Sequence, residues 1–220
     1  MLPTPSQIGQ LAQRSGSLFI YAATLSVLSL TAESTKKHAE IDVLYTAILR
    51  SALEEAQMEE HEAEDVKLVL RTVLFAQEPI SVETIAVLAG LDSPQRVYFA
   101  LQLLRSVLHQ SEDTKLVSTL HASFPDVMLS SDRSEPFFCY IVNHSKRLAE
   151  RCLAVMKDQL EFNICKLESS FVPDDKVEDR GGRIKQPISP TLAYAFRYWV
   201  NHLTLAPRSD ALLKWTRAVM

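Results

Sequence analysis

Glycine, cysteine and tryptophan are all scarce in this chain. Of its 220 residues, 5 are glycine, 3 are cysteine and 2 are tryptophan, whereas 47% are hydrophobic. Little glycine together with many hydrophobic side chains is typical of a folded protein and excludes a disordered, low-complexity one. The three cysteines form no CxxC and have no histidine at zinc-ligand spacing, so no metal site is predicted.

The chain also lacks a basic excess and an export signal. Its formal net charge is −4 at pH 7, so the overall charge does not point to a polyanionic partner. Met1 is not followed by a basic start and an apolar run, as in a signal peptide. With so few cysteines, we expect a protein of the reducing cytoplasm.

One stretch near the start has no charged residue. It lies between Arg14 and Glu33, and residues 18–30 within it are strongly apolar. Serine and threonine side chains interrupt the stretch, and its apolar part is shorter than the roughly 20 residues that a membrane-spanning helix needs. We therefore expect one helix over residues 8–30, or two that abut at Gly16, buried in a protein core, and no membrane span.

Residues 65–121 carry the best-defined pattern in the sequence. Apolar residues at helical spacing predict a first helix, a second runs from Ser81 to Gly90, and a third follows the Ser93–Pro94 cap. Two extended segments then flank the polar turn 111–114. Three helices followed by a β-hairpin is the winged-helix order. The residues expected in its shared core are Leu70, Ile85, Leu101 and Leu104.

Helices are predicted on both sides of this region. One covers residues 41–56 and is followed by an acidic stretch, which we interpret as a solvated helix end and linker. Residues 143–167 form another, a charged linker covers 174–185, and Ser189–Pro190 caps a further helix. Its predicted apolar stripe is Leu192, Ala195, Phe196, Trp199 and Leu203. A last short helix is expected over 210–219. The sequence thus predicts a mainly α protein: a helical segment (1–60), a winged-helix domain (61–131) and an α-helical domain (132–220).

His121 is the candidate functional residue. It ends an apolar, β-prone run, and Ser123 is placed to cap a helix that has Pro125 and Asp126 in its first turn. Backbone N–H groups without partners converge at such a helix start, where a phosphate can bind. A histidine at such a junction is more often structural, so both interpretations stay open.

Several segments in this order resemble fungal NACHT-type signal-transducing NTPases, which are STAND proteins and relatives of NOD-like receptors. The residues that carry the resemblance lie at 16–24, 45–49, 78–81, 120–126, 151–152, 163–167 and 194–199, with His202. The resemblance implies that His121 contacts the β-phosphate of bound ADP and that Phe19 lies near the adenine. Phe19 stands where many relatives have proline, and Ala122 stands where the family has aspartate.

The P-loop of that family is absent from this sequence. No GxxxxGK[ST] is present, and no apolar run ends in paired acids for magnesium. We therefore expect no catalysis and no cofactor in isolation, with ADP or ATP bound only when the chain is joined to an upstream nucleotide-binding domain. The resemblance places that domain upstream and a repeat region downstream, together with protein partners.

Three alternatives remain beside this interpretation. An α-helical scaffold or protein-interaction fragment with no nucleotide role would explain every apolar stripe. DNA binding is disfavoured, because the third helix offers only Arg96 and Arg105 and the hairpin turn is acidic. A nucleophile and base could be imagined in the pairs Cys139–His144 and Cys152–His202, but a cysteine on an apolar helix face is usually structural.

Overall fold

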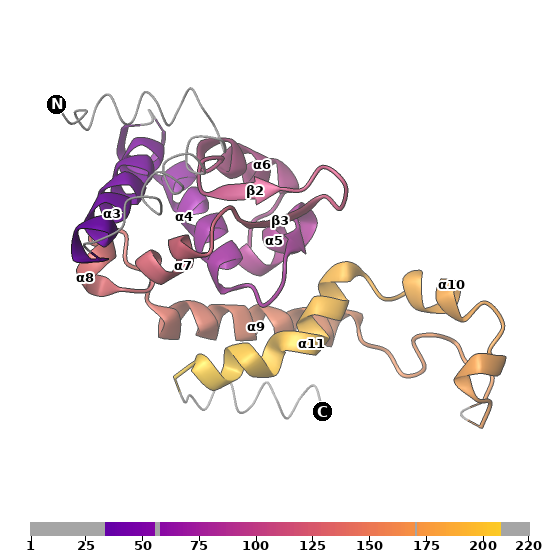
Figure 1. Cartoon of the computed structure of the whole chain (residues 1–220). Helices are drawn as coiled ribbons and strands as arrows, with labels where there is room; N and C mark the ends of the chain where they lie inside the picture. Colours follow the sequence, from indigo (N-terminus) through magenta and orange to yellow (C-terminus); the bar gives the residue numbers. More distant parts are fainter. Residues whose placement is uncertain (1–33, 56–57, 170, 208–220) are drawn as a thin grey trace. The chain divides into compact units, whose positions relative to one another are not determined.

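The computed structural model describes residues 34–55, 58–169 and 171–207 (Figure 1). The predicted helices at 8–30 and 210–219, and Phe19, lie outside these residues. The described part is mainly helical with one small three-stranded antiparallel sheet, which confirms the predicted fold class. Its contacts divide the chain into two compact units, one up to His144 and one from Ser145. None of its helices is long and apolar enough to cross a bilayer.

The first described helix is α3 (Ser34–Arg50), which continues into a π-helical turn, η1 (Ser51–Glu55). It begins earlier than the predicted start at residue 41. Its buried residues Tyr45, Ile48, Leu49 and Ala52 follow one another at helical spacing across the junction of α3 and η1. These four side chains therefore fix one face of α3 and η1 in the core of the first unit.

Three helices follow and pack against one another: α4 (Glu60–Phe75), α5 (Val82–Ala89) and α6 (Pro94–Leu103). The Ser81 hydroxyl accepts a hydrogen bond from the Thr84 N–H at 3.3 Å and caps α5, as predicted. Gly90 ends α5 with φ 75°, a left-handed conformation that favours glycine. Ser93 and Pro94 begin α6 as predicted, although the Ser93 side chain makes no capping hydrogen bond.

The sheet consists of β1 (Ile80–Ser81), β2 (Leu108–Gln110) and β3 (Leu116–Thr119) in the order β1-β3-β2. Its strands are antiparallel, with Ile80 opposite Val117 and Leu108 opposite Thr119. The predicted hairpin is confirmed, and the short extended segment predicted before α5 pairs with β3 as a third strand. Helix, strand, two helices and hairpin is the winged-helix order.

The predicted core of this region is correct except at Leu101. Leu70, Ile85 and Leu104 are at most 2% exposed, whereas Leu101 is half-buried. The buried residues of α6 are Val97 and Ala100, so Leu101 lies beside the buried face and not on it. The helix ends at Leu103, and the Val107 and Leu108 N–H groups both donate to the Leu104 carbonyl in the turn that follows. Leu104 and Leu108 therefore reach the core from this turn and from β2, not from the helical stripe predicted for residues 97–108.

The acidic stretch was interpreted as solvated, which is wrong for Asp65. Glu59 and Glu62 form a capping box at the start of α4, and Glu59 is exposed. Asp65 is buried one turn further on, because it pairs with Arg96 from α6. Arg96 also contacts Asp92 at 3.1 Å. This ion pair joins α4 to α6.

Two short helices follow the sheet: α7 (Ser123–Met128) and α8 (Ser131–Ser134). Phe124, Val127 and Met128 of α7 are buried. Arg133 of α8 forms a two-pronged ion pair with Asp42 of α3, with N–O distances of 2.7 and 3.0 Å. This pair holds α3 and α8 beside each other (Figure 1).

The second unit is helical. Helix α9 (Ile141–Gln159) begins in the first unit and continues into the second, which also contains η2 (Asp174–Lys176), α10 (Arg180–Lys185) and α11 (Pro190–Leu205). The helix predicted to run to residue 167 ends at Gln159, so Leu160 is not on it and is 39% exposed. The charged segment predicted as a linker contains η2 and α10.

Helix α11 has the predicted cap but a different buried face. The Ser189 hydroxyl accepts from the Leu192 N–H at 3.0 Å and donates to the Gln159 side chain at 3.0 Å. Phe196, expected in the apolar stripe, is 64% exposed. The buried face contains Thr191, Leu192, Tyr194, Ala195 and His202. The stripe was predicted from hydrophobicity alone, whereas the inner face also holds a tyrosine and a histidine, whose hydroxyl and Nε2 are hydrogen-bonded to each other at 2.9 Å.

Candidate functional site around His121

His121 lies in the short connection between β3 and α7. The residue before it is anchored to the sheet, because the Leu120 N–H donates to the Val107 carbonyl at 2.9 Å. The residues after it begin α7, where the Phe124 N–H donates to the His121 carbonyl at 3.1 Å. The backbone of His121 is therefore held on both sides, as the sequence predicted, and its side chain is half-buried.

The prediction that Ser123 caps α7 is wrong. Ser123 is the first residue of α7, Ala122 occupies the capping position, and no side chain makes a capping hydrogen bond there. The Ser123 N–H instead donates to Nδ1 of His121 at 3.1 Å. Two backbone donors at the start of α7, those of Ser123 and Phe124, are thus bonded to His121 itself. They do not form the open phosphate cradle that was expected.

A chain of hydrogen bonds leads from α3 to the imidazole. The Tyr45 hydroxyl lies 2.9 Å from the Ser123 hydroxyl, which lies 2.7 Å from Nδ1 of His121. Burial raises the pKa of Tyr45 above its ordinary value, an effect that the hydrogen bond with Ser123 opposes and Asp42 reinforces. Tyr45 therefore keeps its proton at neutral pH and can act as a donor.

The direction of these hydrogen bonds follows from the backbone. An N–H can only donate, so Nδ1 of His121 must present its lone pair to the Ser123 N–H. The Ser123 hydroxyl must then also donate to Nδ1, and its oxygen accepts from the Tyr45 hydroxyl. We accordingly assign the proton of the neutral ring to Nε2. Nε2 has no hydrogen-bond partner among residues 34–55, 58–169 and 171–207.

Tightly packed groups surround this chain of hydrogen bonds. The rings of Tyr45 and Phe124 lie with their centroids 5.0 Å apart, and both side chains are at most 1% exposed. The guanidinium of Arg133 is bound to Asp42, so its charge is neutralised within the protein. The pKa of Arg133 is raised, chiefly by this hydrogen bond. The groups around His121 therefore hold its ring through Nδ1 and leave Nε2 without a bond to the described residues.

A serine hydroxyl beside an imidazole also occurs in nucleophilic catalysis. Here the Ser123 oxygen already accepts from Tyr45, and the same Nδ1 that would act as base is shared with the Ser123 backbone N–H. Both contacts restrain the hydroxyl in a fixed orientation within α7. The geometry fits a serine that orients the histidine better than a histidine that activates the serine.

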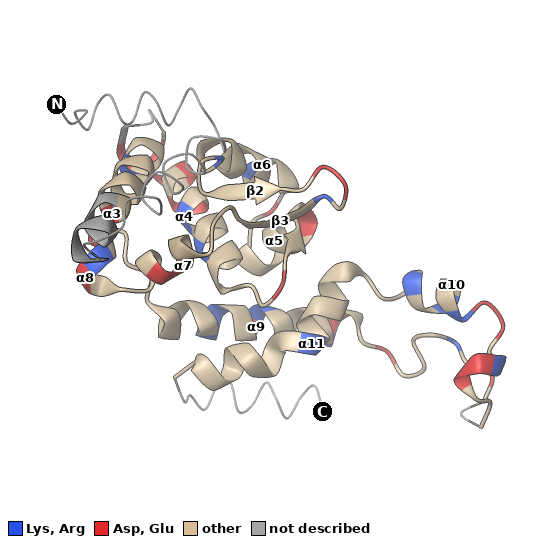
Figure 2. Ribbon diagram, viewed as in Figure 1, with Lys and Arg blue, Asp and Glu red and all other residues tan. Residues whose placement is uncertain are grey.

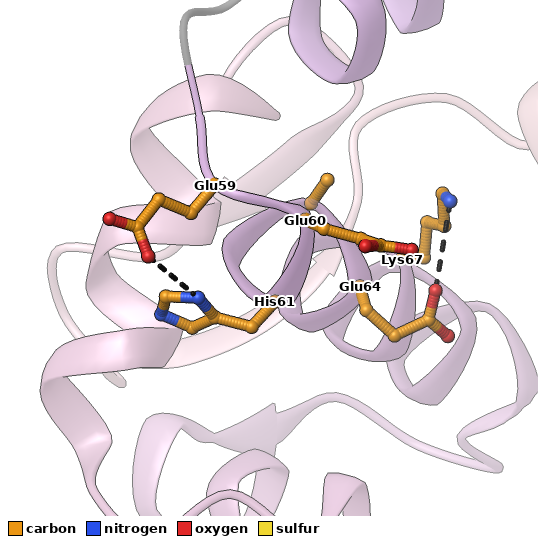
Figure 3. Close-up of a pocket in the computed structure, with 6 residues that line it drawn as sticks. Glu59, Glu60, His61, Glu64 and Lys67 are labelled. Carbon is orange, nitrogen blue, oxygen red and sulfur yellow. Dashed lines mark ion pairs between the residues drawn. The ribbon is translucent and has the colours of Figure 1, made fainter.

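Three hollows of about 580, 470 and 450 Å³ lie on the winged-helix region, and His121 lines none of the three. The first, at the start of α4, is lined by carboxylates with His61 and Lys67 (Figure 3). Glu59 pairs with His61 at 3.2 Å, and Glu64 pairs with Lys67 at 3.6 Å. Two of the three carboxylates that line this hollow are thus paired with its basic side chains, Glu60 being the third. Over the described ranges, no group of three or more His, Cys, Asp or Glu side chains is arranged to hold a metal ion.

Cys139 and Cys152, the two cysteines of the imagined catalytic pairs, are buried core residues. Burial raises the pKa of Cys152 to about 12, and it also raises the pKa of Cys139, which nearby Arg71 partly offsets. A thiol with a raised pKa is a poor nucleophile at neutral pH, since the thiolate is the reactive form. His202, the imagined base for Cys152, has its pKa lowered to about 4 by burial and is hydrogen-bonded to Tyr194.

Sequence reasoning did not find Tyr45 as part of the site. Its helical spacing with Ile48 and Leu49 predicts burial, but no local signal links it to Ser123, 78 residues later. No protein-family model, curated protein or solved structure matches the chain. The resemblance to NACHT proteins therefore rests on the sequence motifs alone.

Proposed function

We propose that this chain is the non-catalytic regulatory and interaction portion of a nucleotide-switched signalling protein of the NACHT type. In this proposal it stabilises the ADP-bound off state of an upstream P-loop domain and acts in the cytoplasm through protein partners. The observation that carries the proposal is the fixed imidazole of His121, with Nδ1 bonded inward and Nε2 left as a donor. Such a group suits a phosphate oxygen that another domain presents.

The expected contribution of His121 is a hydrogen bond from Nε2–H to a phosphate of ADP. A hydrogen bond to a charged group contributes about 1.5–3 kcal/mol. A ligand favours only the conformation that binds it better, so this contact would stabilise the closed, ADP-bound arrangement. A shift of this size changes the ratio of two conformations by tenfold or more.

The charge distribution supports a function without DNA binding. Arg96, one of two basic residues expected on the DNA-facing helix, is bound to Asp65 and Asp92. Glu112 and Asp113 are exposed in the turn between β2 and β3, where the ribbon is red in Figure 2. An acidic turn repels the phosphate backbone, which a winged helix must approach in order to read DNA.

A specific observation favours the second candidate function, a helical scaffold. Several residues that carry the family resemblance bond to one another: Tyr45 to Ser123, Tyr194 to His202, and Asn163 to the backbone of Leu167. Internal pairs of this kind explain those residue types by folding alone. In the scaffold interpretation His121 is a structural residue and no nucleotide is bound.

The nucleotide content of the protein distinguishes the two functions. The protein is produced together with the proposed upstream nucleotide-binding domain, purified without added nucleotide, denatured, and assayed for released ADP by chromatography. We expect about one ADP per P-loop domain in the wild type and a marked loss in His121→Ala. His109→Ala, which removes an exposed histidine of β2, is the matched control and should retain ADP.

The scaffold function predicts a different outcome. His121→Ala and His109→Ala would then contain the same amount of nucleotide as the wild type, or none of the three proteins would contain any. Either result rejects the proposed contact between His121 and ADP.

A further inference from the structure

We infer that Ser123 and Tyr45 are positioning residues for His121: together they hold the ring in the tautomer that presents a proton at Nε2. The chain of hydrogen bonds from Tyr45 through Ser123 to Nδ1 has one consistent direction, because the Ser123 N–H also points at Nδ1. Because two protein donors bond to Nδ1, this nitrogen carries no proton, and the proton of the neutral ring is on Nε2. The inference deepens the proposed function and rests on it for the identity of the ligand, but not for the tautomer.

The ligand chemistry follows from the tautomer. With its proton on Nε2, this nitrogen of His121 can donate a hydrogen bond and cannot accept one or coordinate a metal ion. It therefore suits an oxygen acceptor, such as a phosphate, and is unsuited to a metal ion, which requires the lone pair of an unprotonated nitrogen. Histidine tautomers are set by the hydrogen bond of the opposite nitrogen, and Ser123 provides that bond here.

The positioning also depends on how α3 is packed. Tyr45 lies on α3, whereas His121 and Ser123 follow β3 in the sequence, at the start of α7. The chain of hydrogen bonds is therefore complete only while α3 packs against α7. The Tyr45–Phe124 ring contact and the Arg133–Asp42 ion pair maintain that packing. A displacement of α3 would remove the Tyr45 donor and loosen the orientation of the His121 ring.

Nitrogen-15 spectra of the histidine rings test the inference on the chain as it is, without nucleotide. The Nδ1 and Nε2 chemical shifts report how the proton is distributed between them. For wild-type His121 we expect an unprotonated Nδ1 and a protonated Nε2. Ser123→Ala should lower the ratio of the Nε2-protonated to the Nδ1-protonated tautomer about two- to tenfold, as expected for the loss of one hydrogen bond. Tyr45→Phe should change it in the same direction by less.

Two controls keep the spectra interpretable. His109, exposed on β2, is an internal reference whose signals should not move in either variant. Tyr45→Phe keeps the buried ring and therefore the fold, so it provides the test even if Ser123→Ala is unstable. A wild-type proton on Nδ1, or an unchanged His121 ratio in both variants, would overturn the inference.

A second measurement connects the tautomer to the ligand. In the protein that contains the upstream domain, the rate of ADP release should rise in the order wild type, Tyr45→Phe, Ser123→Ala and His121→Ala. If the spectra change as expected but the release rates do not, the tautomer assignment stands and the nucleotide function fails. If the spectra do not change, the positioning role fails whatever the release rates show.

Discussion

Each unit of the molecule joins a tyrosine to a histidine, but the two sites differ in what they leave open. In the first unit Tyr45 reaches His121 through Ser123, and the histidine is half-buried with Nε2 directed away from these bonds. In the second unit the Tyr194 hydroxyl lies 2.9 Å from Nε2 of His202, whose side chain is fully buried. The Nδ1 atom of His202 is buried and has no hydrogen-bond partner within the described part of the chain.

The difference separates a candidate ligand-binding histidine from a structural one. The two pairs share the same residue types, and both lie in segments that carry the family resemblance. What distinguishes them is the burial of the ring that carries the second nitrogen, because His121 is half-buried and His202 is fully buried. Residue type alone does not decide the role of a histidine; the environment of each nitrogen does.

The largest loss of stability is expected from a substitution in the core of the first unit, which holds the Tyr45–His121 pair in place. Leu104→Asp places a charge without a partner in the core shared by the three winged-helix helices, where Leu104 is fully buried. An uncompensated buried charge costs about 3–5 kcal/mol, so the first unit should unfold or be severely destabilised. Leu101→Asp, at a half-buried position on α6, should cost about 1 kcal/mol. Urea denaturation of both variants measures the difference, and equal losses would reject the corrected core.

The next effect is the pH dependence of the second pair. Burial lowers the pKa of His202 from 6.5 to about 4. Between pH 6.5 and pH 4 the unfolded chain binds a proton at His202 that the folded chain does not bind. The free energy of unfolding therefore has its full value above pH 6.5 and decreases as the pH falls to 4. The loss is about 3 kcal/mol. Urea denaturation at several pH values should show it.

Replacing the histidine checks the source of this dependence. His202→Gln has no imidazole to protonate, so its stability should change less between pH 6.5 and pH 4 than that of the wild type. His109→Gln removes an exposed histidine instead and controls for the loss of one histidine. If His202→Gln keeps the full wild-type slope, the pH dependence belongs to other groups and His202 is not the buried neutral base described above.

The smallest losses of stability are expected when the tyrosine of each pair is replaced by phenylalanine. Tyr194→Phe removes the partner of a fully buried ring nitrogen and should cost about 1–3 kcal/mol, the penalty for an unsatisfied buried polar group. Tyr45→Phe leaves a half-buried serine that still bonds to His121, so about 0.5–1.5 kcal/mol is expected. Thermal unfolding of the two variants measures both costs. A larger loss for Tyr45→Phe would reverse the comparison.

The elements of the first unit were largely predictable, because local signals determine them. Ser81 and Gly90 mark the ends of α5, and the polar turn 111–114 marks the hairpin. The end of α6 was not predictable, since the apolar spacing continues through Leu104 and Leu108 although the helix stops at Leu103. Both leucines are buried in either arrangement, so hydrophobicity does not distinguish a helix from a turn there.

The candidate site was predicted only in its position. The sequence places His121 between a strand and a helix, which the structure confirms. The predicted role of Ser123 was wrong because a serine before a helix usually caps it. Here the Ser123 N–H and hydroxyl are instead hydrogen-bonded to Nδ1 of the nearby His121 ring. The contact with Tyr45 is tertiary, between residues 78 positions apart, and sequence spacing carries no information about it.

The rate of ADP dissociation tests the central claim most directly. It is measured with a fluorescent ADP on protein that includes the proposed upstream nucleotide-binding domain, for the wild type, His121→Ala and the control His109→Ala. A lost hydrogen bond of about 1.5–3 kcal/mol corresponds to release that is at least tenfold faster. We predict that increase for His121→Ala and an unchanged rate for His109→Ala. If all three proteins release ADP at the same rate, His121 is a structural residue and the proposed nucleotide contact is wrong.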